Sequence, residues 1–403
     1  MASHAQDAAI IHTADKAVLA KLSCVEHGYY DDPFVRPMSR GLDAGPSRGS
    51  SMMEPIIRRG THARVMAIDR AIAAFLSLSL KSSSNEDDGC KVKRQIVILG
   101  SGRDTSYLRY RLGQLGNNDS SQNEFVRWYE VDHPSIICQK AFDWLPVSMP
   151  TGYECNRTAV THDDCNANES YVLSISKAEA KDLSTSQDNS SYHLIGYDLR
   201  HSTSKLFDIL SHPRHQYDKS IPTLFILECV MMYLPNDKSR ELIHYLAASV
   251  NDVVSNRDVF VAVAIYDPVP CHDRFGQVMI QNLQKAGIVK QRRDCDDPIQ
   301  LSLEATHTVV DQLSKLIQCG FDSVVGCDMM DAYNNGVIRI EETQRAARCE
   351  MLDELEEFVL LMRHYCFCVG VRANGTSVGY GLCGIGKNSL MGFQEGHCTS
   401  LAK

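Results

Sequence analysis

The chain has 403 residues, a hydrophobic fraction of 44% and a formal net charge of −9 at pH 7. This length is enough for a sizeable core in one large or two modest domains, and the acidic balance argues against nucleic acid as a partner. Fifteen cysteines without a C-x-x-C spacing indicate reduced thiols rather than a disulfide framework or a zinc ribbon. The longest apolar run, LFILECVMMYL, is too short to span a bilayer. We therefore expect a soluble, cytoplasmic protein that contacts no membrane.

The N-terminal part of the chain is expected to contain a frayed or helical tail, an irregular segment, a helix and a polar linker. Residues 1–20 are rich in alanine, and KLSCVEHGYYDDPFVRPM, which follows, has no single periodicity and predicts irregular backbone that either packs on the core or grips a ligand. Residues 61–80 predict a helix with one apolar face. Arg64 would lie near its start, where a cation is unfavourable against the helix dipole, which indicates a binding role. Residues 81–91 predict a polar linker.

The central motif is QIVILGSGRDT, residues 95–105, an aliphatic run that ends in two glycines and is followed by TSYLRYRLGQL. This order predicts a buried strand, a tight turn and a helix start. Gly100 and Gly102 would let the backbone approach a ligand closely, as in nucleotide-type cofactor sites. A dinucleotide fingerprint would have a third glycine where Thr105 stands, so an ordinary strand-to-helix turn is the alternative.

The next segments place acidic groups and a polar insertion after this turn. EFVRWYEVD predicts a strand ending at Asp132, which suits hydrogen bonds to ribose hydroxyls; capping of a helix that enters at His133-Pro134 is the alternative. Residues 146–191 are rich in Ser, Thr, Asn and Asp and predict a surface insertion or a partly disordered loop. His212 and His215 are separated by Pro213 and have no suitably spaced partners, so no metal site is expected.

Alternating strands and helices then predict a mostly parallel α/β sheet covered on both faces. YHLIGYD would end at Asp198, TLFILECVMMYL would carry Glu228 inside it, and VFVAVAIYD would end at Tyr266 and Asp267. Because ligands bind at the carboxyl ends of parallel strands, these groups are expected to converge with the glycine turn. An unpaired carboxylate in an aliphatic strand is costly, so Glu228 should meet a cation or a hydrogen-bond donor.

Taken together, the chain resembles the leucine carboxyl methyltransferases, which methylate the C-terminal carboxylate of type 2A protein phosphatase catalytic subunits with S-adenosylmethionine. The resemblance covers nearly the whole chain and implies a Rossmann-like seven-stranded methyltransferase sheet with a last antiparallel strand and an N-terminal helical cap. It rests on these blocks in this order: HGYYDDPFV, RRGTHARV, QIVILGSGRDT, YEVDHP, GYDLR, LECVMMYLP, DRFGQVMIQNL, DMMDAYN and LMRHYCFC.

The same resemblance implies which residues bind the cofactor. By position they are Lys21 and Arg64 for the methionine carboxylate, Gly100 for the loop under the cofactor, Asp132 for the ribose hydroxyls, Asp198 and Leu199 for the adenine, and Glu228 for the methionine amino group. It divides the chain into a cap and substrate-facing segment, 1–94, and a core, 95–403, which together form one structural unit. The departures are the 146–191 insertion and the longer tail after Cys368, both expected at the surface.

The reaction would need alignment rather than a catalytic triad. A C-terminal carboxylate has a pKa of about 3.5, so at neutral pH it is already the nucleophile. The enzyme must set its oxygen about 3 Å from the sulfonium methyl and exclude water. Tyr233, Tyr266 and Arg274 are the candidates on the acceptor side, and Arg274 would position the carboxylate through parallel hydrogen bonds.

The partner implied is the phosphatase catalytic subunit, gripped by its tail and its body, with the Gly28–Val35 segment and the cap as the expected contact. We expect a monomer. Two alternatives stay open: a transfer-RNA modifying branch of the same family, and a non-catalytic phosphatase-binding module. Proteins of the transfer-RNA modifying branch have a longer chain with an additional repeat domain. Only 35 residues follow Cys368 here, which are too few for such a domain. The intact acidic and basic site residues argue against the second.

Overall fold

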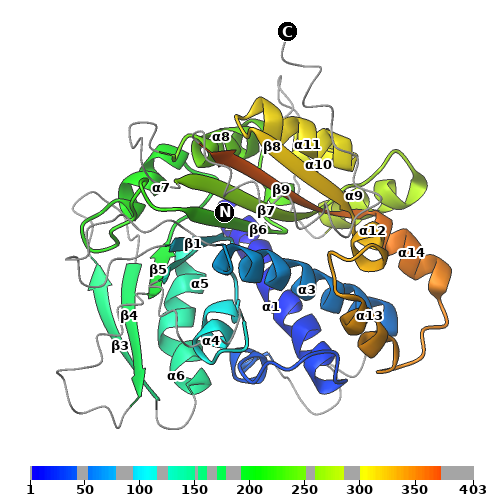
Figure 1. Cartoon of the computed structure of the whole chain (residues 1–403), viewed down its shortest axis with the longest axis horizontal. Helices are drawn as coiled ribbons and strands as arrows, with labels where there is room; N and C mark the ends of the chain where they lie inside the picture. Colours follow the sequence, from blue (N-terminus) through cyan, green and yellow to red (C-terminus); the bar gives the residue numbers. More distant parts are fainter. Residues whose placement is uncertain are drawn as a thin grey trace.

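The structure is a computed structural model that describes residues 2–42, 53–78, 94–115, 126–149, 153–160, 170–177, 192–250, 259–285 and 300–373. Within these residues, nine strands form one sheet in the order β3-β4-β5-β2-β1-β6-β7-β9-β8 (Figure 1). The five central strands run parallel: β1 (Arg94–Leu99), β2 (Val126–Asp132), β5 (Tyr192–Gly196), β6 (Thr223–Glu228) and β7 (Phe260–Pro268). The last strand, β9 (Tyr365–Ala373), lies antiparallel between β7 and β8 (Ser323–Asp328). The predicted Rossmann-like α/β fold is confirmed.

Seven of the nine strands correspond to the predicted sheet, and the other two come from the 146–191 insertion. β3 (Tyr153–Val160) and β4 (Ser170–Lys177) form an antiparallel pair, and β4 joins the edge of β5. The prediction left a surface insertion and a partly disordered loop as alternatives, and the loop alternative is wrong for these residues because they form strands. β3 is the outer strand and exposes residues 156–159, whereas Tyr171 and Leu173 of β4 are buried. A strand at the edge of a sheet with exposed side chains has the polar composition of a loop. This composition explains why the strands of the insertion were not predicted.

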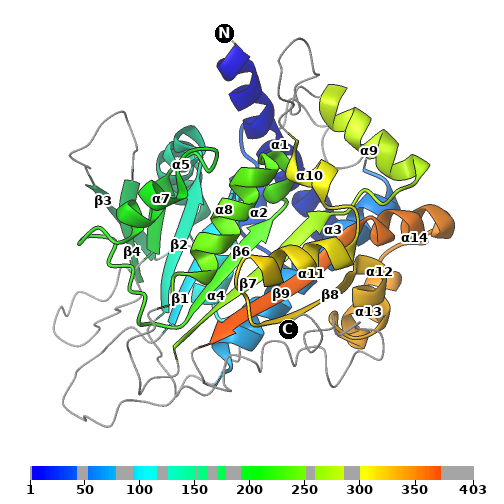
Figure 2. The same cartoon turned by 90° about the horizontal axis from the view of Figure 1, so that it is seen from above.

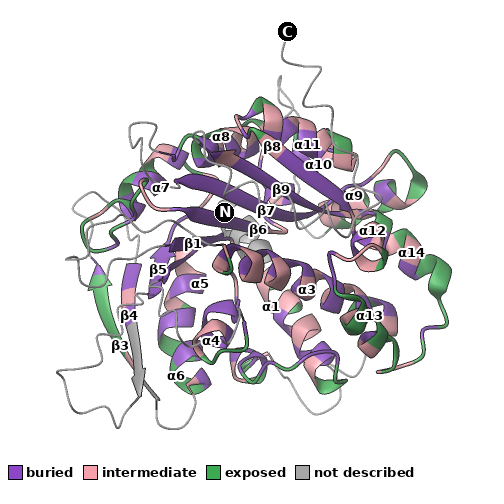
Figure 3. Ribbon diagram, in the orientation of Figure 1, coloured by how far each residue is buried: buried purple, intermediate pink, exposed green. Residues whose placement is uncertain are grey.

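Helices cover both faces of the sheet, as Figures 1 and 2 show. One face is covered by α1 (Ala2–Glu26), α3 (Pro55–Leu76), α4 (Ser106–Arg111) and α5 (Pro134–Gln139), and the other by α7 (Thr203–Leu210), α8 (Asn236–Ala247) and α11 (Val309–Gln318). Because side chains alternate along a strand, Ile96 and Ile98 pack under the first group, and Val97 and Leu99 under the second. Both faces of the sheet are thus buried (Figure 3).

The remaining elements are short or peripheral. They are α2 (Val35–Met38), the π-helical turn η1 (Lys140–Trp144), α6 (Leu145–Ser148), the 3-10 turn η2 (Met231–Tyr233), α9 (Arg274–Lys285), α10 (Ser302–Ala305), α12 (Met329–Asn334), α13 (Ile340–Ala347) and α14 (Leu355–Arg363). No helix within the described residues is long and apolar enough to cross a bilayer. The predicted linker 81–91 lies outside the described residues, and so does the chain beyond residue 373. The tail after Cys368 was expected at the surface, which is wrong for residues 369–373, because they complete β9 and the side chains of Val369 and Val371 are buried.

The helix that carries Arg64 starts earlier than predicted. α3 begins at Pro55, so Arg64 lies in its middle and the argument from the helix dipole is wrong. Proline at the first helical position marks this start, since its fixed φ suits a first turn. Gly60 lies inside the helix, and a Cβ there would be 3.6 Å from Leu361 Cδ2 of α14. The glycine therefore lies where α3 faces α14, with room for an ordinary van der Waals contact, rather than at a helix boundary.

The segment from Lys21 to Met38 packs on the core instead of opening toward solvent. Its first six residues complete α1, and the side chains of Tyr29 and Phe34 are buried. The Tyr29 hydroxyl donates to Glu350 Oε1 at 2.6 Å, and Asp32 Oδ2 accepts from Thr105 Oγ1 at 2.6 Å. Asp32 thereby ties this segment to the turn that follows β1. The Gly28–Val35 segment was the expected contact with a partner, and its aromatic side chains are buried inside the molecule.

Candidate active site

A cavity of roughly 560 Å³ lies at the carboxyl ends of the central strands, between the sheet and helices α1 and α3. Nine of the ten predicted site residues line it: Lys21, Arg64, Gly100, Asp132, Asp198, Leu199, Glu228, Tyr233 and Tyr266. The tenth, Arg274, is exposed at the start of α9 and does not line the cavity. Arg274 was expected on the acceptor side because it follows the fifth predicted strand, but the part of α9 that reaches the cavity is its later turns, which carry Leu283.

The glycine turn forms the floor of one end of the cavity. Gly100 and Gly102 have φ of +70° and +51°, a region that favours glycine. A Cβ at Gly100 would lie 2.5 Å from Val230 Cγ2, so the loop after β6 closes directly on this turn. The turn leads through Asp104 into α4, as predicted, although α4 is only six residues long.

Asp132 fastens this turn to the end of β2. Its Oδ2 accepts from the Gly102 amide at 2.6 Å, and its Oδ1 accepts from the His133 amide at 2.6 Å. His133, not Asp132, is the N-cap of α5, because its side chain accepts from the Ser135 amide. The capping alternative for Asp132 is therefore wrong. Burial raises the pKa of Asp132 above its ordinary value, and each oxygen has a second lone pair for a ligand.

Glu228 is the last residue of β6, not a residue inside it, and Cys229 follows with φ of +56°. As expected for a buried carboxylate, it meets cations: Arg64 Nε donates to its Oε1, and Lys21 Nζ lies 3.6 Å from the same oxygen. Burial opposes the charged form, but Arg64 and then Lys21 outweigh it and lower the pKa of Glu228 to about 2. The carboxylate is ionised and holds two cations at the cavity wall.

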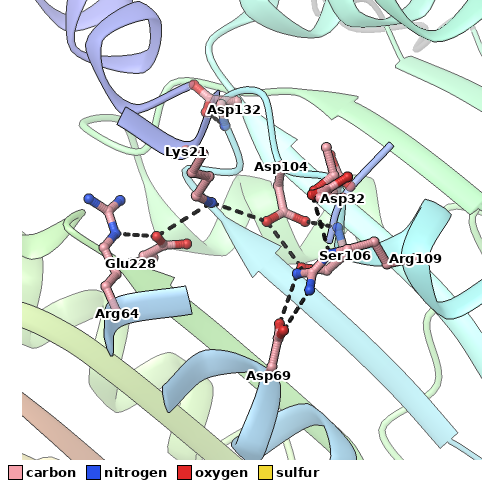
Figure 4. Close-up of polar contacts among 12 residues, drawn as sticks. Lys21, Asp32, Arg64, Asp69, Asp104, Ser106, Arg109, Asp132 and Glu228 are labelled. Atoms are coloured by element: carbon pink, nitrogen blue, oxygen red, sulfur yellow. Dashed lines mark hydrogen bonds and ion pairs between the residues drawn. The ribbon is translucent and has the colours of Figure 1, made fainter. Parts of the chain in front are cut away.

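Figure 4 shows that these charges continue inward as a chain of alternating sign. Lys21 Nζ also lies 3.8 Å from Asp104 Oδ2, and Asp104 accepts from the Ser106 amide at 2.8 Å. Beyond Ser106, the Arg109 guanidinium makes a two-point hydrogen bond with Asp69. Asp104 lines the cavity and was missed by the sequence analysis. The signal that could have indicated Asp104 was its place two positions after Gly102, the second glycine of the turn.

The third of the predicted acidic residues, Asp198, lies two residues beyond the end of β5. Arg200 folds back onto it, with Nη2 to Oδ2 at 2.6 Å and its amide to Oδ1 at 2.9 Å. Burial disfavours the charge on Asp198, but Arg200 outweighs this effect and lowers the pKa. Leu199, between them, packs at the edge of the core formed by α7 and α8. This corner of the cavity thus combines an apolar side chain with a fixed carboxylate.

The opposite end of the cavity is aromatic and apolar. Tyr266, at the end of β7, stacks on Tyr365 of β9 with ring centroids 5.3 Å apart, and the Arg64 guanidinium lies 5.4 Å from the centre of the Tyr266 ring. Tyr233 comes from the turn after β6. Three apolar side chains complete this wall: Leu283, Leu361 and Met362. Tyr365 gave no local sequence signal, because only the pairing of β9 with β7 brings it here.

Comparison with known proteins identifies this arrangement. Residues 9–247 match the family model described as "Leucine carboxyl methyltransferase". The chain belongs to this family. The matched region contains eight of the predicted site residues and leaves out only Tyr266 and Arg274.

Relatives in the leucine carboxyl methyltransferase family align with almost the whole chain. The leucine carboxyl methyltransferase 1 homolog of Arabidopsis thaliana is 29% identical over 92% of this chain and 91% of its own length. Leucine carboxyl methyltransferase 1 of Rattus norvegicus is 28% identical over 91% of this chain and 90% of its own length. A solved O-methyltransferase family protein from Burkholderia thailandensis is 10% identical, with a TM-score of 0.36, over 85% of this chain and 72% of that one. This last similarity is too low to bear on function.

Proposed function

We propose that this protein transfers a methyl group from S-adenosylmethionine to the α-carboxylate of the C-terminal leucine of the type 2A protein phosphatase catalytic subunit. The observation that carries the proposal is the meeting of Lys21, Arg64 and Glu228 in one cavity with the glycine turn and Asp132. Membership of the leucine carboxyl methyltransferase family supports the reaction class. The phosphatase as acceptor follows from the family resemblance of the sequence blocks.

The groups that line the cavity fit this cofactor chemically. Its methionine end carries a carboxylate and an ammonium, which match the two cations and the carboxylate of Glu228 respectively. Asp132 offers acceptor lone pairs for ribose hydroxyls, and Asp198 with Leu199 offers a polar and an apolar contact for adenine. Gly100 lets the chain lie close under the cofactor. The volume is within the range of roughly 300 to 1,000 Å³ usual for small-molecule sites.

S-adenosylmethionine, when bound, supplies a methyl group activated by a sulfonium. The residues of this chain need to supply no base, since the acceptor carboxylate is ionised at neutral pH. Tyr233 and Tyr266 instead position the acceptor, and with Tyr365 and the apolar wall they keep water from the carboxylate. The guanidinium of Arg64 points away from Glu228 beyond Nε, so its terminal nitrogens are available to a carboxylate (Figure 4). Burial raises the pKa of Tyr266 far above neutrality, so its hydroxyl stays a donor.

Transfer of isotope-labelled methyl tests the proposal. The protein is incubated with tritiated S-adenosylmethionine and the phosphatase catalytic subunit, either intact or lacking its terminal leucine. We expect label in the intact subunit alone. Label in transfer RNA instead would favour the alternative branch of the family, and binding of the phosphatase without label would favour a non-catalytic module.

A further inference from the structure

A buried ion pair lies behind the glycine turn, outside the cavity. Lys140, the first residue of the π-helical turn η1, donates to Glu130 Oε2 of β2, and both side chains are 0% exposed. The Tyr192 hydroxyl of β5 donates to the other oxygen, Glu130 Oε1, at 2.7 Å. None of these three residues lines the cavity. π-Helical turns occur often at functional sites, and this cluster makes one further contact.

That next contact is the backbone of the glycine turn. Lys140 Nζ donates to the carbonyl oxygen of Asp104 at 2.7 Å. The carboxylate of the same Asp104 faces the cavity and lies 3.8 Å from Lys21 Nζ. The Val131 carbonyl of β2 accepts from the Gly100 and Ser101 amides at the start of the turn. Side chains hold the turn at two further points, Asp132 at Gly102 and the buried ion pair at Asp104. A shift of the Asp104 backbone would move the carboxylate that orients Lys21.

Stability alone gives no reason to keep this ion pair. Two charges taken out of water lose hydration, and a packed apolar pair of similar volume is often as stable or more stable. Glu130 and Lys140 instead satisfy a fixed set of partners, which are a phenol hydroxyl and a backbone carbonyl. The Tyr192 ring also stacks on Tyr107 of α4, with centroids 4.0 Å apart, so the helix after the turn is held by the same cluster.

We propose that Lys140, Glu130 and Tyr192 form a positioning cluster that fixes the glycine turn for cofactor binding. Through Asp104 it sets the place of the Lys21 ammonium, and it touches neither cofactor nor acceptor itself. This inference rests on the proposed function, because it names the role of the cluster in that same site. The cluster is expected to raise the affinity for the cofactor. It is not expected to change the affinity for the acceptor or the stability of the fold.

The test is a double variant, Lys140→Met with Glu130→Leu, which replaces the ion pair by an apolar pair in the full-length protein. Its matched control, Lys238→Met with Glu241→Leu, removes an ion pair at the surface. Calorimetry measures the affinity of S-adenosylhomocysteine, and kinetics give the KM of each substrate. We expect the dissociation constant and the cofactor KM to rise at least tenfold, about 1.4 kcal/mol, with the acceptor KM and Tm close to wild type. The control should match wild type.

Failure of this inference is distinct from failure of the proposed function. If the wild type does not bind S-adenosylhomocysteine, the proposed function fails. If the wild type binds it and the folded double variant binds equally well, the cluster is only structural and the inference is overturned. Should the double variant not fold, Tyr192→Phe decides, since it removes one hydroxyl. An affinity reduced by about threefold supports the cluster, whereas an unchanged affinity overturns it.

Discussion

Arg64 joins the two halves of the cavity. Its Nε donates to Glu228 on the cofactor side, while its guanidinium carbon lies 5.4 Å from the centre of the Tyr266 ring on the aromatic side. Arginine suits this position because its planar fork can bind a carboxylate at one edge and an aromatic ring at its face. The same side chain can therefore align the methionine end of the cofactor relative to the acceptor.

We expect Arg64→Ala to weaken binding of S-adenosylhomocysteine by about 1.5 to 3 kcal/mol, the usual worth of a hydrogen bond to a charged group. Calorimetric titration of the variant against wild type gives this difference directly. Lys238→Ala, which removes a surface cation with a carboxylate partner, is the control and should bind as wild type does. Equal affinities for Arg64→Ala and wild type would remove Arg64 from the cofactor site.

The lowered pKa of Glu228 should make the free energy of unfolding depend on pH. Its pKa is lowered from 4.5 to about 2 in the folded protein, so its ionised form stabilises the fold above about pH 4.5, and this contribution is lost as the pH falls toward 2. The free energy of unfolding of wild type should thus exceed that of Glu228→Gln by a few kcal/mol near pH 6, and the difference should shrink as the pH falls below about 4.5. Denaturant unfolding at several pH values measures it. A difference that does not change with pH would contradict the ion pairs described here.

Much of the site was readable from the sequence because charged residues at strand ends stand out against aliphatic runs. Asp132 and Glu228 are of this kind, and the glycines before them mark the turn. Asp104, Tyr365 and the Lys140–Glu130 pair were not predicted. Their roles depend on contacts between distant segments, such as Lys140 Nζ with the Asp104 carbonyl, which no local pattern encodes. Arg274 shows the converse error, since closeness to a strand end in sequence did not bring it to the cavity.

At the scale of elements, β4 is the least expected part of the fold. It pairs with β5, and its Leu173 is 1% exposed and belongs to the core on the face of the sheet that α1, α3, α4 and α5 cover. The central strands were predictable because they are buried on both faces and read as continuous apolar runs. The β3–β4 pair was not, because exposed polar residues of β3 mask the inward-facing residues of β4. The start of α3 was missed for a related reason, since Gly60 imitates a helix boundary.

We expect Leu173→Ala to lower the free energy of unfolding by about 2 to 5 kcal/mol, the range for removing a buried leucine side chain. Asn156→Ala, on the exposed outer strand β3, should change it by less than about 0.5 kcal/mol. Urea unfolding of both variants tests the pairing. If Leu173→Ala were as stable as Asn156→Ala, the hairpin would not be part of the core.

At the scale of the whole molecule, recognition of a protein acceptor needs more than a pocket for one residue. A short peptide must be ordered on binding, and that costs entropy which few contacts offset. A folded partner adds a second contact and raises the effective concentration of its tail at the cavity. The buried aromatic residues of the Gly28–Val35 segment cannot provide that contact without rearrangement.

Because a folded partner adds a second contact, we expect the intact phosphatase catalytic subunit to be methylated with a far higher kcat/KM than a peptide of its last residues. Initial rates with both substrates over the same concentration range measure the ratio. Equal kcat/KM values would mean that the tail alone carries recognition, and the partner would then be defined by its C-terminal sequence only.

The most direct measurement of the central claim is the position of the transferred methyl group. The phosphatase catalytic subunit is incubated with this protein and S-adenosylmethionine, and its C-terminal peptide is analysed by mass spectrometry before and after mild base. We predict one added methyl group, located on the carboxyl group of the terminal leucine and removed by base as an ester would be. A methyl group found on any other atom of the subunit, or none at all with a protein that binds the cofactor, would contradict the account.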